Sequence, residues 1–521
     1  MSKLVHSSVT GSRLAEAENP SAVGRNLRPI RAFEWSLLGL YALLLGLVAS
    51  RHSCGFDEIQ AWLIARDSSS LASLFYHLRF EGHPALWYLF LYIPAHISWN
   101  PASMQTMNYV FALAWAWLIL SARRLPWSIR VLIIFSYYGF YQYGVLPRNY
   151  MLATLLLTTA TRCLVGERQH RKTAILLLAL CVNTHFFAIP VVAVLFLQMF
   201  GLSKLTSWKD LGKLLHDSEF QIASVVLIAS VLAAYFTLRP AGDLYTPVLY
   251  PDEHVSPVVY YLRCESYLWR ALIPPHLLTE RIHWLNSLLA RTALGAGLSV
   301  ALFLLVTAAL KTRQARTVFL AAPLLIGIAM GATVRRPGIE HLGLVFIAFI
   351  LSLLIDAYAE QGGKGHRWLS PRAACTVVIA ILGLQTLDAA GASLYEWGHP
   401  FSYAKTISIW FRQAGLDENP LVLMPPVPAF LGYMERRSAY YPACRCNGSF
   451  LVWKRDLDID RGVTEDELDN LSHSSPLPVV AVTIRELPPA TLQSLRLKEI
   501  HAFPPISISS GQFYVYQRLD P

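Results

Sequence analysis

Charged residues are scarce in this chain, and their scarcity excludes an ordinary soluble protein. Only 15% of the 521 residues are Asp, Glu, Lys or Arg, whereas 54% are hydrophobic and the mean hydropathy is +0.40. Soluble domains carry about 25% charged residues. The composition therefore favours a chain that lies largely in lipid.

A concentrated basic surface is also missing, although the net charge is +10. The Lys and Arg residues stand in short segments between apolar runs, at 25–31, 123–124, 162–172, 204–213, 311–316 and 364–372. A nucleic-acid-binding chain would gather them on one face, so we expect no nucleic-acid partner. Short basic loops between apolar runs are typical of the cytoplasmic side of a membrane protein.

Cysteines are few and scattered, which argues against a zinc module. Of the seven, Cys444 and Cys446 are too close together for a metal knuckle, and no second Cys/His pair follows at zinc spacing. A disulfide from this pair to another cysteine stays open if the region lies outside the cell.

Long apolar runs are abundant instead. Nine of them approach the ~20 residues that cross a ~30 Å hydrocarbon layer, at residues 35–50, 108–122, 129–146, 174–197, 222–238, 294–310, 318–334, 342–357 and 374–387. A buried soluble helix explains any one of these runs but not nine in series. The sequence predicts an α-helical polytopic membrane protein of about 11–13 transmembrane helices with a small C-terminal α/β domain.

The expected organisation has three parts. Residues 1–31 form a basic, cytoplasmic N-terminal tail, too polar for a cleavable signal peptide. Residues 32–392 form the multi-span domain, with a first outer loop at 51–84 that contains two short amphipathic helices; Ser70 is a fair N-cap for the second, at 71–78. Residues 393–521 form an extracytoplasmic α/β domain with strands near 421–424, 479–484 and 512–517, and helical stretches at 404–414 and 427–436.

The segment at residues 85–99 leaves the topology open. It is barely long enough to span, and Pro94 and His96 interrupt it. If it crossed fully, Arg123 and Arg124 would face outward, against the positive-inside rule.

The first outer loop carries an acidic pair, Asp57 and Glu58, a few residues beyond the first run. One carboxylate of such a pair can take a proton from an incoming hydroxyl while its neighbour orients the acceptor. Taken alone, the pair also fits an ordinary solvated loop.

The motifs of this loop resemble those of the GT-C glycosyltransferases, a superfamily that includes the protein O-mannosyltransferases and the lipid A aminoarabinose transferase. Phe56-Asp57-Glu58 is similar to the Phe/Tyr-Asp-Glu motif after their first helix. His83-Pro84-Ala85 stands where they have Lys-Pro-Pro or His-Pro-Pro. The resemblance implies that Asp57 is the catalytic carboxylate and that His83 lies near the phosphate of the donor.

Six further residues are candidates for substrate binding, three of them in the middle of the chain and three in a later turn. The resemblance places Arg148 and Tyr150 in the same cavity, with Arg148 balancing the donor phosphate; the alternative is an arginine that reaches to the headgroups. His185 lies within a long apolar stretch, either in a turn between two spans or facing a cavity, with an interhelical histidine as the alternative.

The other three candidates lie in the basic turn before the apolar run at residues 342–357. Arg335, Arg336 and His341 lie on the expected outer side, and two arginines there go against the positive-inside trend. They are predicted to clamp a phosphate or lipid head, with headgroup snorkelling as the alternative.

The tyrosines at 137, 138, 141 and 143 favour an interfacial aromatic belt over sugar stacking. With no third carboxylate near Asp57, Glu58 and His83, we expect no metal cofactor.

Together these features predict a membrane enzyme. It would move a hexosyl or pentosyl group from a polyprenyl-phosphate-linked donor to an unknown glycan, lipid or protein acceptor on the non-cytoplasmic face, with inversion and with Asp57 as base. A bacterial cytoplasmic membrane is preferred to the endoplasmic reticulum. The alternatives are a flippase, polymerase or ligase of lipid-linked glycans, or a non-enzymatic membrane scaffold.

Overall fold

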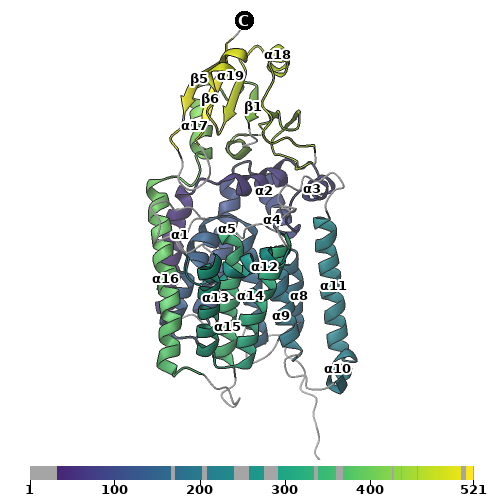
Figure 1. The fold of residues 1–521 in the computed structure, drawn as a ribbon, viewed down its shortest axis with the longest axis vertical. Coiled ribbons are helices and arrows are strands. Elements are labelled where there is room, and N and C mark those ends of the chain that lie inside the picture. The colour runs from purple at the N-terminus through teal and green to yellow at the C-terminus, as the bar shows by residue number, and fades with distance from the viewer. Residues whose placement is uncertain are drawn as a thin grey trace, which may run out of the picture.

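The computed structural model describes residues 32–165, 170–201, 208–239, 257–274, 292–333, 338–359, 368–424, 428–435, 437–454, 456–505 and 512–519. Long helices run side by side along the longest axis, and a small sheet built from the C-terminal residues lies beyond one end of them (Figure 1). We call this end, which also carries the short helices α2 (Phe56–Asp67) and α3 (Leu71–Leu78), the sheet-side end.

Within the described ranges, five helices are long and apolar enough to cross a membrane. They are α1 (Ala32–Arg51), α11 (Ser218–Leu238), α14 (Arg313–Thr333), α15 (Ile339–Tyr358) and α16 (Pro371–Gly398). At 1.5 Å per residue, a helix of 20 residues matches the ~30 Å hydrocarbon layer. Each corresponds to one of the predicted apolar runs.

Several shorter helices accompany these five. They are α5 (Ala102–Leu120), α6 (Trp127–Ile134), α7 (Asn149–Val165), α8 (Arg171–Val182), α9 (Ile189–Met199), α10 (Trp208–Leu215), α12 (Pro257–Ser266) and α13 (Thr292–Ala309), with 3₁₀ turns at η3 (Phe186–Ala188) and η5 (Leu268–Ala271).

Burial separates the central helix from the peripheral ones. In α15, 83% of the apolar window is buried inside the chain, against 17% in α11. Most of the side chains that α11 leaves exposed are apolar, including Ile222, Val225 and Phe236. A helix with an apolar exposed face suits contact with lipid.

One predicted run is broken into two kinds of helix. After α6, Ser136 accepts a hydrogen bond from the Gly139 N–H, and the chain continues as the π-helix η2 (Tyr137–Val145). Gly139 is required there, because a Cβ would lie 2.6 Å from the Trp115 ring and 2.8 Å from the Ile133 carbonyl oxygen. A π-helix inside an apolar run often marks a functional site.

Helix α4 (Leu86–Ile97) answers the topology question. Glu34, in the first turn of α1, pairs with Arg123 (2.6 Å) and Arg130 (2.8 Å). At the other end of α1, Gln105 Nε2 donates to the His52 carbonyl oxygen at 3.0 Å. Helices α1 and α5 are therefore antiparallel neighbours, and α4 between them does not cross. Residues 123–124 thus lie at the same end as the start of α1.

The first outer loop folds as predicted into two short helices, α2 and α3. The Ser70 hydroxyl accepts from the Ser73 N–H at the start of α3, which confirms the N-cap. Leu74 and Leu78 of α3 are buried, whereas Leu71 and Phe75 are exposed.

The C-terminal part is a mixed six-stranded sheet in the order β3-β2-β1-β4-β6-β5. Its strands are β1 (Leu421–Met424), β2 (Ala439–Tyr441), β3 (Cys446–Gly448), β4 (Val480–Thr483), β5 (Leu497–Ala502) and β6 (Tyr514–Arg518). β1 is parallel to β2 and β4, and the other pairs are antiparallel. Four short helical segments accompany the sheet: α17 (Ala404–Gln413), η7 (Pro428–Tyr433), α18 (Glu465–His473) and α19 (Pro489–Ser494). The predicted mixture of helices and strands in this part is confirmed.

The structure answers one question that the sequence left open in this part and moves one boundary. Cys444 and Cys446 form a disulfide with each other, not with a third cysteine. Helix α16 continues to Gly398, so the expected boundary at residue 393 falls within its last two turns.

The sheet and the first outer loop share one hydrophobic core. Ile59 and Trp62 of α2 pack in the same buried cluster as Phe430 and Val480. Gln60 adds a hydrogen bond from Nε2 to the Leu451 carbonyl oxygen at 2.7 Å. The C-terminal part is thereby fixed directly over the helix that carries the acidic pair.

Candidate active site at the sheet-side end

The first turn of α2 presents its two carboxylates to different surroundings. Asp57 and Glu58 are successive residues, so their side chains point about 100° apart around the helix. The Asp57 side chain is 61% exposed, whereas that of Glu58 is 3% exposed. Only Asp57 therefore faces the open side.

Arg148 joins Asp57 to the helical part. It lies between η2 and α7, and its Nη2 is 3.3 Å from Asp57 Oδ2. Its Nη1 is 4.0 Å from Glu340 Oε1, at the start of α15. The guanidinium lies 5.3 Å from the Tyr150 ring centroid. One half-buried arginine thus links three segments that are far apart in the sequence.

A group of aromatic rings lies beside this ion pair. The His185 ring centroid is 4.4 Å from that of Tyr150, 5.5 Å from that of His83 and 6.0 Å from that of His341. Tyr150 is fully buried, and its hydroxyl has no hydrogen-bond partner among the described residues. The rings and the ion pair together form what we call the Arg148 cluster: Asp57, His83, Arg148, Tyr150, His185 and His341.

Two of the histidines are held by local backbone contacts. His185 is in the turn between α8 and η3, where its Nδ1 accepts from the Phe187 N–H at 3.1 Å. His341 Nδ1 accepts from the Gly338 N–H at the start of α15 at 3.2 Å. Of the two readings for residue 185, the turn is confirmed.

The environment keeps the His83 imidazole neutral. Burial and the nearby Arg148 guanidinium lower the pKa of His83 to about 4. A neutral imidazole carries one N–H donor and one acceptor nitrogen, so it can either donate a hydrogen bond to a polar ligand group or accept one from it.

Glu81 is a second carboxyl on this side that sequence reasoning missed. Its Oε1 accepts from Gln60 Nε2 at 2.9 Å. Burial raises the pKa of Glu81 to about 8; the hydrogen bond from Gln60 opposes this shift and the Asp57 carboxylate adds to it. Glu81 directly precedes Gly82 and His83 in the sequence. Its position next to the predicted phosphate-binding histidine could have identified it as a candidate site residue.

Glu58 belongs to another set of contacts. Its Oε1 lies 3.1 Å from His52 Nε2, and its Oε2 accepts from the Gly55 N–H. His52 Nδ1 in turn lies 2.7 Å from Glu396 Oε1 on α16. The expectation that both carboxylates serve one site is not met, because burial and these partners turn Glu58 away from Arg148.

The favoured interpretation of the η2 tyrosines is wrong. Tyr137, Tyr138, Tyr141 and Tyr143 are all buried inside the chain and do not form an exposed interfacial belt. Tyr143 donates to the Glu340 carbonyl oxygen at 2.6 Å, and its ring stacks on Tyr150 at 5.0 Å.

Two predicted residues cannot be placed at the site. Arg335 and Arg336 lie outside the described residues. The predicted phosphate clamp is therefore represented in the structure by His341 alone.

No family model matches the sequence, and no curated protein or solved structure matches the chain. The chemistry of the site is therefore inferred from its own residues.

Proposed function

We propose that this chain is a multi-pass membrane glycosyltransferase of the GT-C kind that takes its sugar from a polyprenyl-phosphate donor at the sheet-side end. Support for the membrane setting comes from the five long apolar helices and from the apolar exposed face of α11. The pairing of Arg123 with Glu34 puts Arg123 at the same end as the start of α1, an arrangement that agrees with the positive-inside rule.

The observation that carries the proposal is the contact between Asp57 and Arg148 at 3.3 Å. It brings together an exposed carboxylate from the first outer loop and a guanidinium from a junction about 90 residues later. A base and a phosphate-binding cation are the two groups that transfer from a sugar phosphate requires. The guanidinium also lies 5.3 Å from the Tyr150 ring, which contacts the His185 ring, and the His341 ring lies next to that of His185.

In the proposed reaction the donor phosphate displaces Asp57 from part of the Arg148 guanidinium. A guanidinium offers five N–H donors in a planar fork, which fits phosphate oxygens. The freed Asp57 carboxylate accepts the proton of the acceptor hydroxyl. The acceptor oxygen then bonds to the anomeric carbon from the face opposite the phosphate.

The bond between the anomeric carbon and the phosphate oxygen breaks in the same step, and the polyprenyl phosphate leaves with the electron pair. Negative charge grows on that oxygen, and Arg148 stabilises it. Attack from the opposite face inverts the anomeric configuration.

The test replaces Asp57 by Asn in the full-length chain, with Asp460→Asn as the matched control. Asp460 is 78% exposed and forms an ion pair with Arg485, which is exposed as well. The probes are decaprenyl-phosphate-linked mannose, glucose and aminoarabinose, and the readout is loss of the donor. We expect Asp57→Asn to lower turnover by about 10²–10⁴-fold, the usual contribution of a positioned base.

Binding of plain decaprenyl phosphate separates catalysis from folding. Asp57→Asn removes the carboxylate that competes for Arg148, so it should bind this lipid at least as tightly as the parent chain. Turnover of Asp57→Asn at the parent rate would refute the assignment. Intact assembly of lipid-linked glycans in cells carrying only that variant would favour the flippase, polymerase or ligase alternative.

A further inference from the structure

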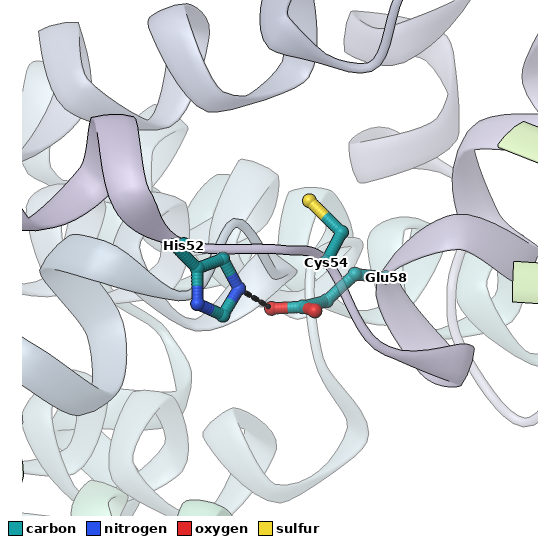
Figure 2. Close-up of side chains that lie close together, drawn as sticks. All are labelled: His52, Cys54 and Glu58. Atoms are coloured by element: carbon teal, nitrogen blue, oxygen red, sulfur yellow. Dashed lines mark hydrogen bonds and ion pairs between the residues drawn. The ribbon is translucent and has the colours of Figure 1, made fainter. Parts of the chain in front are cut away.

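A second polar cluster lies behind the first turn of α2, sealed from solvent. Figure 2 shows His52 and Glu58 in contact, with the Cys54 side chain beside them on the same loop. A ring nitrogen of His52, Cys54 Sγ and a Glu58 carboxylate oxygen all lie within 4.8 Å of one another, and the contact with Glu58 is made by His52 Nε2. The side chains of His52 and Glu58 are 0% and 3% exposed, and Cys54 is also fully buried.

The contacts of His52 indicate that a cation lies between His52 and Glu58. Its Nδ1 lies 2.7 Å from Glu396 Oε1, a contact that holds a proton on Nδ1. The lone pair of Nε2 then faces the Glu58 carboxylate at 3.1 Å. Two acceptors at this distance need a cation between them, which is either a proton or a metal ion.

The cysteine distinguishes between these two cations. A proton shared by His52 and Glu58 gives the Cys54 sulfur no role, whereas a borderline-soft metal ion uses nitrogen, sulfur and oxygen donors together. The backbone also holds this residue in place, because the Cys54 N–H donates to Tyr433 Oη at 2.8 Å.

We propose that His52 Nε2, Cys54 Sγ and a Glu58 carboxylate oxygen bind one zinc ion, and that Glu396 orients the imidazole from its other nitrogen. Two ligands of a tetrahedral zinc ion lie roughly 3.4–3.6 Å apart, given bonds of about 2.0–2.3 Å. The nitrogen-to-oxygen distance of 3.1 Å is within a few tenths of an ångström of that value. A carboxylate on the far nitrogen of a ligating histidine is the usual support for such an ion.

The consequence of this site is mechanical. His52 directly follows α1, Glu58 is in the first turn of α2, Glu396 is near the end of α16, and Tyr433 belongs to the C-terminal part. One ion would tie the end of α1 to the start of α2 next to Asp57, and hydrogen bonds from His52 to Glu396 and from the Cys54 N–H to Tyr433 connect it to the other two segments. This inference does not depend on the transferase proposal, because none of the three ligands belongs to the Arg148 cluster.

The experiment uses the full-length chain purified in detergent without chelators. Zinc is counted by inductively coupled plasma mass spectrometry after exhaustive dialysis, and we expect about one ion per chain for a site with these three protein ligands. Replacing zinc by Co²⁺ should give the thiolate-to-cobalt absorption band in the near ultraviolet. Both measurements use the unmodified chain, so they do not depend on whether a variant folds.

Matched cysteine variants then locate the ion. Cys54→Ser should lose the thiolate-to-cobalt band and bind zinc at least tenfold more weakly. Cys181→Ser, at another buried free cysteine, should keep both properties. Dialysed chain that holds no zinc, takes up none from added ZnCl₂ and shows no cobalt band would overturn the proposal and leave His52 bridged by a proton. Equal zinc binding by the two variants would overturn it as well, because the ion would then lie elsewhere.

Discussion

The two carboxylates at the start of α2 are neighbours in the sequence but lie in opposite surroundings. Asp57 is exposed and pairs with Arg148, which is half-buried. Arg148 also contacts the Tyr150 ring, and it lowers the pKa of the nearby His83. Glu58 faces a sealed cluster in which its partner is the buried His52, which in turn contacts the buried Glu396. A carboxylate in the open cluster can exchange its partner for a substrate, whereas one in the sealed cluster can only hold the structure together.

The largest expected effect on stability comes from the sealed cluster. Glu396→Ala removes the partner of His52 Nδ1 and the acceptor of the Tyr141 hydroxyl, which lies 2.6 Å away. Breaking a buried, charged pair from one side lowers the free energy of unfolding by about 3–5 kcal/mol. Thermal unfolding of the purified chain, followed by circular dichroism, measures it.

The comparison variant for that experiment is Asp57→Ala. An ion pair with one exposed partner contributes about 0–1 kcal/mol, so this variant should melt close to the parent chain. If the two variants destabilised the chain equally, the distinction between an open and a sealed carboxylate would be wrong.

A smaller effect, on activity, comes from Arg148→Lys in the open cluster. The variant keeps the charge but loses the fork of N–H donors that reaches Asp57 and Glu340. A lost hydrogen bond to a charged group is worth about 1.5–3 kcal/mol, so kcat/KM for the lipid-linked donor should fall by about 10- to 100-fold. Arg485→Lys, at an exposed pair, is the control and should leave kcat/KM unchanged.

The smallest effect is a dependence of stability on pH through His83. Burial and Arg148 lower the pKa of His83 to about 4, and His341 and Asp57 act on it in opposite senses. His185, whose ring is 5.5 Å away, is the remaining titratable neighbour. In the unfolded chain the His83 imidazole is protonated with a pKa near 6.5, whereas in the folded chain it is protonated only at about pH 4.

Stability should therefore be complete above pH 6.5 and decrease as the pH falls from 6.5 towards 4. His83→Gln should show a shallower decrease in the thermal midpoint over that range, with the two chains compared in the same detergent. Parallel curves for the parent and the variant would show that His83 is solvated and titrates normally.

Sequence patterns sufficed for features that depend on local periodicity. The apolar runs, the Ser70 cap and the strand at Leu421–Met424 follow from residues within one turn or one strand of each other. The motif residues Asp57, His83 and Arg148 also come together, because each lies at the end of a predicted element.

The features that the sequence did not show depend on distant partners. His52 meets Glu396 across 344 residues, and nothing near either residue indicates which face of α16 will lie against α1. The same limit applies to Tyr141, whose buried acceptor is also Glu396. The short α4 could be judged only from the ion pairs at the ends of its neighbours, because its length fits both topologies.

The bond between Cys444 and Cys446 makes the chain report on the compartment in which it folds. Such bonds form and persist where the surroundings are oxidising, and glutathione and thioredoxin keep cytosolic thiols reduced. A chain whose sheet lay in the cytosol would expose two thiols to an alkylating reagent, and one whose sheet lay in an oxidising compartment would expose neither. The two cysteines thus give a chemical measure of orientation in any cell that makes the protein.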